Sequence, residues 1–383
     1  MSDTTNPMKW IWHNSMLGTL STCEQKGKYS YIDGLKRPET SVSIAMLRGS
    51  WFHGLMAAQG LKQGLKQDTL LVIPNTVDLG HERLNDVSLI PGVGDNGYVL
   101  VPSGTEEAYA VDPSAVHQMW LDRVMTYMPT GDEAWDKLGK EVWSLYQRYL
   151  AVWGPVLVTE RVLLVEHQWQ RTETSSGLTY GGRVDRVVGS QDGRVIIRDH
   201  KTTAMAPSAD ARLTASQLHL YAWGLAPLLD EYDLQPQAIE FEYVITRKPG
   251  SVHLTKAGNL YKNMGTVDEY SLVEGLKALD VDPEDEKWAS AREEAREVGD
   301  PTFFHRALMP VNETVVASLL AQGESAAETA VSLSEGATPL RATGRHCEWC
   351  QFQKICTGDL YGNDTSPLRA EFGKRDVTTV EVF

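Results

Sequence analysis

Three charged residues in the middle of the chain, Asp185, Asp199 and Lys201, have the types and spacing of a catalytic site. Asp199 and Lys201 are two residues apart in a segment rich in β-branched residues, so on a strand both side chains point to the same face. If the preceding hairpin closes with a three-residue loop at 191–193, Asp185 lies opposite Asp199 and shares that face. Two carboxylates this close repel each other unless a cation lies between them.

Positive charge for this carboxylate pair can come from two sources. Lys201 supplies part of it, and a hard divalent metal would supply more, because carboxylate oxygens in an open site suit Mg²⁺ or Mn²⁺. The alternative is a surface hairpin with a cross-strand salt bridge, which needs no metal. The two interpretations differ in whether other parts of the chain contribute further site residues.

The four cysteines of the chain form a second pattern with chemical meaning. Three of them follow the spacing C-x2-C-x5-C near the C-terminus, and the fourth lies more than 300 residues upstream: Cys347, Cys350, Cys356 and Cys23. In a reducing compartment, cysteines spaced in this way indicate metal or iron–sulfur ligands before disulfides. Four thiolates suit either Zn²⁺ or an iron–sulfur cluster, so both stay open at this point.

The composition is that of a globular protein, with 36 basic and 51 acidic residues among 383 and a net charge of −15. This charge argues against a protein whose whole surface attracts nucleic acid, although it leaves room for a local basic groove. The sequence contains neither G-x-x-x-x-G-K-[ST] nor G-x-G-x-x-G, which disfavours a P-loop motor and a Rossmann dinucleotide site. No apolar run approaches the roughly 18 residues of a membrane span, and the first twenty residues do not resemble a secretory signal. We therefore expect a cytoplasmic protein without a membrane segment.

Hydrophobic periodicity predicts the elements that position these residues. Apolar residues at three- and four-residue steps predict helices, and β-branched runs bounded by turn residues predict strands. Helices are expected over much of 8–60, over 131–153 and 215–229, and over most of 266–298, with a solvated helix or linker at 321–340. Strands are expected at 156–171, 179–189, 194–203 and 238–247.

The residues that carry a family resemblance are Gly182-Arg-Val-Asp185 and a following strand that ends Asp199-His-Lys201. Through them the sequence resembles the core of the PD-(D/E)XK nucleases, and most of all their RecB-type branch. That branch carries a glycine–histidine motif on an upstream helix and a Gln-x-x-x-Tyr motif on the next helix. A subset, which includes the CRISPR-associated iron–sulfur exonucleases and AddB-type nuclease domains, holds a [4Fe–4S] cluster with one N-terminal and three C-terminal cysteines. The matching residues here are Gly49 with His53, Gln217 with Tyr221, and the four cysteines in order and spacing.

The resemblance implies a role for each of these residues. Asp185, Asp199 and His53 would be metal ligands, and the backbone carbonyl of His200 would add one oxygen. Lys201 would orient the attacking water and stabilise the charge that develops on the phosphate. The alternative for His53 is a purely structural role, as a core histidine with satisfied hydrogen bonds.

Three further residues receive weaker assignments from the same resemblance. Gln217 and Tyr221 would contact DNA or brace the site, although residues four apart on a helix can also simply hydrogen-bond to each other. Glu166, on the preceding strand, could be a further metal ligand. The resemblance also favours a [4Fe–4S] cluster over Zn²⁺ for the cysteines, with a structural role because its ligands come from both ends of the chain.

The expected fold class is α/β: a restriction-endonuclease-like core with a central mixed β-sheet flanked by helices, a helical insertion, and an iron–sulfur staple that joins the terminal regions. The expected organisation runs in six parts along the chain. They are a helical segment at 1–60, a mainly helical insertion at 61–155, the nuclease core at 156–265, a helical region at 266–340, the cysteine segment at 341–361 and a flexible tail at 362–383.

The function implied is that of an Mg²⁺- or Mn²⁺-dependent DNA exonuclease that leaves a 5′-phosphate and a 3′-hydroxyl. The partner would be DNA, as single strands or ends. The competing hypotheses are a catalytically silent DNA-end-binding module, or the nuclease subunit of a helicase–nuclease or CRISPR-adaptation complex, with any helicase on another polypeptide. Recombination, CRISPR spacer acquisition and phage DNA processing are all compatible with these motifs.

Overall fold

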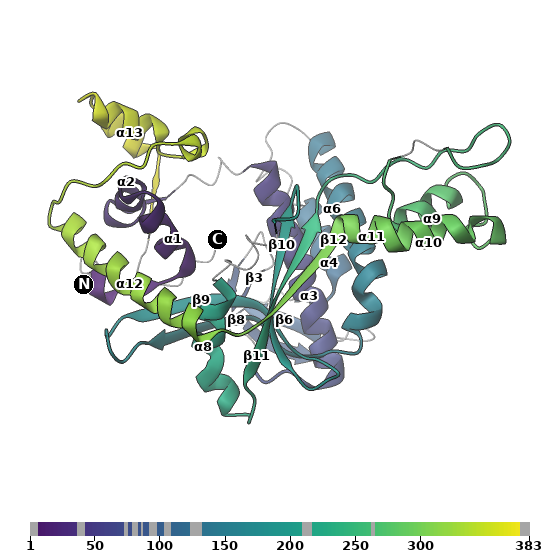
Figure 1. Ribbon diagram of the computed structural model, residues 1–383, viewed down its shortest axis with the longest axis horizontal. Helices are drawn as coiled ribbons and strands as arrows, with labels where there is room; N and C mark the ends of the chain where they lie inside the picture. Colours follow the sequence, from purple (N-terminus) through teal and green to yellow (C-terminus); the bar gives the residue numbers. More distant parts are fainter. Residues whose placement is uncertain are drawn as a thin grey trace.

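A computed structural model describes residues 7–36, 43–72, 76–78, 83–85, 87–91, 98–102, 109–122, 132–208, 217–261 and 265–375. The chain forms a central mixed β-sheet flanked by helices, with a smaller lobe on one side that contains α2 and α13, segments far apart in the sequence (Figure 1). The expected α/β class is therefore confirmed. None of the helices in these ranges is both long and apolar enough to cross a bilayer.

The central sheet is organised around three strands from the middle of the chain. β9 pairs antiparallel with both β8 and β10, and its first residues also pair in parallel with β1. β10 pairs in parallel with β11, which pairs antiparallel with β12. The bounds are Ile11–Trp12 for β1, Arg161–Thr172 for β8, Thr179–Gly189 for β9, Val195–Thr203 for β10, Pro236–Ile245 for β11 and Phe304–Pro310 for β12.

The β9–β10 hairpin has the register that the sequence predicts. Arg198 pairs with Arg186, and the backbone N–H of Ser190 donates to the carbonyl of Arg194 at the tip. A three-residue loop therefore closes the hairpin, and its last residue, Gly193, has φ +83°. A left-handed residue at this position is typical of three-residue hairpin loops and favours glycine.

Helices α3 (Ile44–Gln67), α4 (Pro113–Asp122) and α6 (Asp132–Leu157) build the core on one face of the sheet. Three tryptophans hold these helices together. The ring of Trp51 stacks on Trp120 at 5.0 Å and on Trp135 at 5.3 Å between centroids. Large aromatic surfaces packed in this way contribute strongly to burial, so α3 is fixed firmly beside the sheet.

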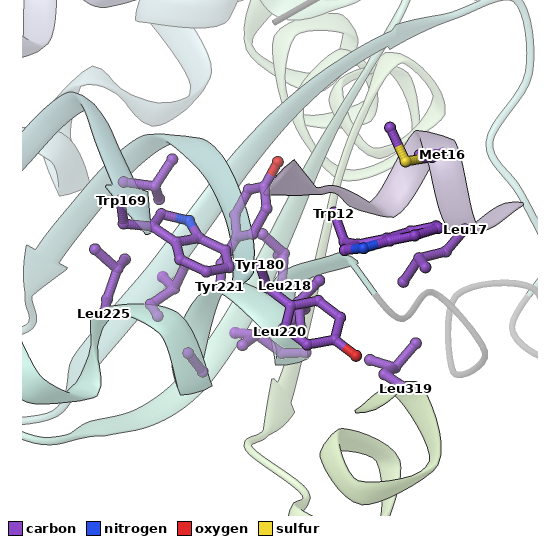
Figure 2. Close-up of a cluster of buried hydrophobic side chains, with 14 of the residues drawn as sticks. Trp12, Met16, Leu17, Trp169, Tyr180, Leu218, Leu220, Tyr221, Leu225 and Leu319 are labelled. Atoms are coloured by element: carbon purple, nitrogen blue, oxygen red, sulfur yellow. The ribbon is translucent and has the colours of Figure 1, made fainter. Parts of the chain in front are cut away.

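Helices α8 (Gln217–Asp230), α1 (Asn14–Thr22) and α12 (Glu313–Ser334) build the core on the other face. Figure 2 shows part of this core, where Trp169 and Tyr180 lie beside side chains of α8, and Trp12 lies beside Leu17 of α1. Gly224 lets α8 approach the sheet, because a Cβ atom there would lie 2.2 Å from the ring of Trp169.

The smaller lobe joins a segment near the start of the described chain to a segment near its end. β2 (Leu35–Lys36) pairs antiparallel with β13 (Gly373–Lys374), and Tyr29 packs against Phe352. Arg369 contacts the carboxylates of Asp33 and Asp359, at 2.9 and 2.7 Å. The lobe also contains α2 (Glu24–Gly27), the π-helical turn η2 (Lys28–Ile32), the 3₁₀ turn η7 (Arg345–Trp349), α13 (Gln353–Leu360) and α14 (Ser366–Ala370).

Four details differ from the elements expected from the sequence. α6 extends to Leu157 and takes in the first residues of the segment predicted as a strand. The region 266–340 contains β12 in addition to helices, and the tail expected to be loose after Gly362 forms α14 and β13. Residues 376–383 lie outside the described chain. The insertion at 61–155 contains short strands: β3 (Thr76–Asp78), β4 (Arg83–Asn85), β5 (Val87–Pro91), β6 (Tyr98–Pro102) and β7 (Tyr109–Ala110).

The remaining elements form a projection at the other end of the molecule from the smaller lobe (Figure 1). A small apolar core around Leu272, Leu276 and Trp288 holds it together. Its helices are α9 (Glu269–Lys277), η5 (Glu286–Trp288), α10 (Ala289–Glu294), the π-helical η6 (Ala295–Gly299) and α11 (Asp300–Phe303).

Candidate active site

Asp185, Asp199 and Lys201 lie together at the end of the β9–β10 hairpin that is remote from its loop. The Nζ atom of Lys201 lies 2.8 Å from Oδ2 of Asp199. Asp199 is almost completely buried and Asp185 is 12% exposed, whereas the Lys201 side chain is 40% exposed. The two carboxylates thus form the inner part of the site and the ammonium group forms its open edge.

Gln217 and Tyr221, on the first turns of α8, brace this trio. Lys201 donates to Oε1 of Gln217 at 3.3 Å, and Nε2 of Gln217 donates to Asp199 at 3.3 Å and to the Tyr221 hydroxyl at 2.7 Å. Tyr221 is only 7% exposed and its ring packs on Trp169. Of the two roles expected for Tyr221, this geometry suits bracing better than contact with DNA.

His53 approaches the carboxylates from α3, on the opposite layer. Its Nδ1 atom lies 3.4 Å from Oδ2 of Asp185. The backbone N–H of His200 donates to the same oxygen at 2.8 Å. His53 is partly exposed, so it is not the fully buried core histidine of the alternative interpretation. Four chain segments therefore converge on one site.

Glu166 lies on β8 beside this site in an unusual backbone conformation. Its φ is +50°, and the β8–β9 ladder passes directly from Val165 to His167, so Glu166 interrupts the pairing opposite Asp185. A left-handed conformation at a non-glycine residue costs on the order of 1–3 kcal/mol. The carboxylate is buried and lies 2.9 Å from Nε of Arg183. Arg183 therefore offsets the charge of this weaker candidate ligand.

Burial and neighbouring charges shift the pKa values of the two aspartates in opposite directions. Burial and the charge of Asp185 raise the pKa of Asp199 to about 6, against the opposing effect of Lys201. For Asp185, burial acts in the same upward direction. His53, His200 and Lys201 together outweigh it, so the pKa of Asp185 lies below its usual value. Partial burial lowers the pKa of Lys201, but the carboxylates Asp199 and Asp185 outweigh burial and raise it.

A buried network of charges that sequence reasoning missed lies directly behind the site. Arg198 is fully buried and forms two hydrogen bonds with Glu160, at 2.7 and 2.8 Å, and one with Glu240 at 2.6 Å. Its Nε atom also lies 3.3 Å from Glu242. One guanidinium thus compensates three buried carboxylates.

Glu242 connects this network to the active site. It accepts a hydrogen bond from the Tyr149 hydroxyl at 2.7 Å, and it lies 2.8 Å from Nδ1 of His200 and 2.6 Å from Arg306. Burial would raise the pKa of Glu242, but Arg198, His200 and Arg306 hold it well below its ordinary range. Since the His200 backbone binds Asp185, the network fixes the strand that carries the catalytic candidates. The signal in the sequence was two alternating glutamates, Glu240 and Glu242, in an otherwise apolar strand.

The donor chemistry of the site suits a hard divalent metal. Two carboxylates, one imidazole and a nearby backbone carbonyl are ligands that Mg²⁺ and Mn²⁺ accept. A metal ion would also relieve the repulsion that contributes to the raised pKa of Asp199. Among the described residues, no group of three or more His, Cys, Asp or Glu side chains is arranged so that it could hold a metal ion without rearrangement. Lys201 occupies part of the space around Asp199 in this arrangement.

All four cysteines line one cavity of about 320 Å³ in the smaller lobe. None of them forms a disulfide. Burial raises the pKa of the Cys350 thiol, and the proximity of Cys23 and Cys347 adds to this effect, while Lys26 opposes it. The thiols are thus neighbours although Cys23 is more than 300 residues from the other three in sequence. Among the described residues, they are not yet arranged closely enough to form a metal-binding group. An iron–sulfur cluster stays a prediction.

One family model matches most of the chain and agrees with the resemblance found in the sequence. The family model described as the PD-(D/E)XK nuclease superfamily matches residues 14–357. Among solved structures, the crystal structure of SSO0001 matches with 12% sequence identity and a TM-score of 0.25, over 62% of this chain and 80% of that chain. A comparison with curated proteins gave no match.

Proposed function

The chain belongs to the PD-(D/E)XK nuclease superfamily, and from this premise we propose that it is an Mg²⁺- or Mn²⁺-dependent deoxyribonuclease that acts as an exonuclease. Nucleic acid is the substrate that the family implies. The observation that carries the proposal is the convergence of Asp185, Asp199 and Lys201, braced by Gln217 and approached by His53. A DNA-binding relative without catalytic activity would not need all three of Asp185, Asp199 and Lys201.

In the proposed mechanism, Asp185, Asp199 and His53 would hold the metal, and the carbonyl oxygen of His200 would be a further ligand. The metal would lower the pKa of a bound water and offset negative charge on the phosphate. The ammonium group of Lys201, at the open edge of the site, orients the attacking water and stabilises charge that develops on the phosphate oxygens. Gln217 fixes Lys201 and Asp199 relative to each other. Glu166 is a reserve ligand that would first have to leave Arg183.

The finer assignment to the RecB-type exonucleases rests on motifs outside the central trio. The glycine of the upstream motif, Gly49, is positioned so that a Cβ atom would lie 3.1 Å from Oγ1 of Thr202. A small residue therefore suits the approach of α3 to the end of β10, which brings His53 within reach of Asp185. Digestion of end-labelled single- and double-stranded DNA in Mg²⁺ tests the whole proposal: progressive shortening from an end supports it, and internal cuts alone would refute the exonuclease assignment.

Cleavage is expected to require Mg²⁺ or Mn²⁺ and to stop in EDTA, while Ca²⁺ supports binding with little turnover because it prefers longer and looser coordination. A proton on Asp199, whose pKa is about 6, competes with the metal. The apparent metal affinity should therefore tighten as the pH rises from 5 to 7. The measurement is cleavage rate against metal concentration at several pH values. Undiminished cleavage in EDTA would refute the metal mechanism.

We also propose that the four cysteines hold a structural [4Fe–4S] cluster. Protein purified without oxygen should be brown and contain about four irons per chain. Cys23→Ser should lose iron and also stability, because Cys23 is the ligand from the N-terminal side. The stability loss should stay below the roughly 4–5 kcal/mol associated with closing a very long loop, because β2, β13 and Arg369 already tie the two segments.

The matched control for the cluster is Ser21→Ala, two residues upstream of Cys23 at the exposed end of α1. It should keep both the iron and the thermal stability of the wild type. Iron analysis and thermal unfolding of the two variants decide the question. A colourless wild-type protein with one zinc per chain would replace the cluster with a zinc site and leave the nuclease proposal intact. Full iron content in Cys23→Ser would show that Cys23 is not a ligand.

A further inference from the structure

We propose that a groove beside the candidate active site binds the sugar–phosphate backbone of the nucleic-acid strand that is cut. The inference rests on the proposed function and adds a substrate-binding surface to it. The groove has a volume of about 850 Å³ and lies between the start of α3, one face of α6 and the segment after β11. Its charged lining residues are Arg48, Lys137, Lys140, Arg148, Lys248, Glu133, Asp136 and Glu141.

The groove begins where the strand that carries Lys201 ends. Arg48 precedes Gly49, where an added Cβ atom would lie 3.1 Å from Oγ1 of Thr202. On the other side, the backbone N–H of Thr246, which lines the groove, donates to the carbonyl of Thr203 at 2.8 Å. A strand with its reactive phosphate near Lys201 can therefore continue into the groove. Figure 1 shows α3 and α6, which line the groove, on the same side of the sheet.

The charge of the groove is opposite to that of the whole chain. Five cations and three carboxylates line it, in a protein with a net charge of −15. Arg148 is buried and compensated by Asp268 at 2.7 Å, so it forms part of the floor. A local excess of positive charge on an acidic protein is the electrostatic pattern expected of a site for a polyanion.

The other cations of the groove are placed to contact phosphates. Glu141 alone contacts both Arg48, at 3.1 Å, and Lys248, at 2.8 Å, so one carboxylate orients two cations across the groove. Lys137 and Lys140 are exposed and form no ion pair with a described residue. Both are therefore available to neutralise phosphates without first breaking a salt bridge.

The spacing along α6 suits an extended strand. Lys137, Lys140, Ser144 and Arg148 follow one another at three- and four-residue steps, so they share one face of the helix. At 1.5 Å per residue, the exposed part of this face, from Lys137 to Ser144, runs for about 10 Å, and the buried Arg148 continues it into the floor. Lysines along this face would contribute sequence-independent binding to the phosphates of one strand.

The test compares the wild type with Lys137→Glu/Lys140→Glu and with the control Lys66→Glu/Lys287→Glu. The control makes the same charge change at exposed positions outside the groove lining, with Lys66 about 27 Å along α3 from Arg48. Binding of a labelled single-stranded oligodeoxynucleotide is measured in EDTA by fluorescence anisotropy at several salt concentrations. Cleavage of the same oligonucleotide is measured in Mg²⁺.

The groove variant should bind about ten-fold more weakly, and the slope of log affinity against log salt should fall in magnitude by about 1.4. KM should rise with kcat within about two-fold of wild type, because the catalytic residues are untouched. Affinity and salt slope equal to wild type, or an equal loss in the control, would overturn the groove. A wild type that binds but does not cut with any divalent metal would instead overturn the proposed nuclease function, while the anisotropy comparison still decides the groove.

Discussion

Asp199→Asn and Lys201→Met should each lower DNA cleavage at least about 100-fold while the protein stays folded. The size follows from the loss of one group that stabilises charge in the transition state, which typically costs 100- to 1000-fold. Asn keeps the shape of Asp199 and its contact with Gln217, but it is a poor metal ligand. Met keeps the length of Lys201 without the ammonium group. Initial rates on end-labelled DNA in Mg²⁺ measure the effect.

Two substitutions of the same kind at exposed positions provide matched controls for this prediction. Asp192→Asn changes a carboxylate at the exposed tip of the same hairpin, and Lys256→Met removes an exposed ammonium group from a surface turn. Both should cut DNA at close to the wild-type rate. Near-ultraviolet circular dichroism should be the same for all four variants. A well-folded Asp199→Asn or Lys201→Met protein with the wild-type rate would refute the active-site assignment.

Arg198→Met should destabilise the protein by about 3–5 kcal/mol, the usual cost of breaking a buried ion pair by removing one partner. The substitution leaves Glu160, Glu240 and Glu242 buried without their shared cation, and Arg306 can compensate only part of their charge. Urea unfolding at pH 7 measures the change in the free energy of unfolding.

The pH dependence of Arg198→Met gives a second readout. Carboxylates that are buried without a cation have a raised pKa in the folded state, so the folded variant takes up protons before the unfolded chain does. The stability lost at pH 7 should therefore be partly regained as the pH falls towards 5. Arg194→Met, at the exposed hairpin tip, should change stability by less than about 0.5 kcal/mol. A loss below 1 kcal/mol in Arg198→Met would show that the network does not depend on this guanidinium.

The sequence predicted the active-site hairpin well because its determinants are local. Alternation along 179–189 and 194–203 defines the strands, and the loop length fixes which residues are opposite each other. The placement of Asp185 near Asp199 follows from that register. Gln217 and Tyr221 could be placed on one face of a helix for the same reason, although only the structure shows that the buried Tyr221 supports Gln217.

Features that depend on distant contacts were not predicted. β12 has a mixed, half-buried pattern, and its place in the sheet depends on pairing with β11. Arg198 and Glu160 are ordinary charged residues in sequence, and their burial becomes visible only when β10 and β11 lie side by side. The left-handed conformation of Glu166 likewise interrupts a strand whose sequence predicts regular extended backbone.

The tight turn of the β9–β10 hairpin has a practical consequence for anyone who engineers this protein. An exposed loop tip is normally the first choice for a peptide tag or a reporter insertion. Here the spacing between Ser190 and Arg194 sets the phase of both strands, and slipping it by one residue would turn Asp185 away from Asp199. An insertion or deletion at this tip would therefore separate the two aspartates of the candidate active site. The turn at 255–258 does not set the register of these strands, so it is the better insertion point.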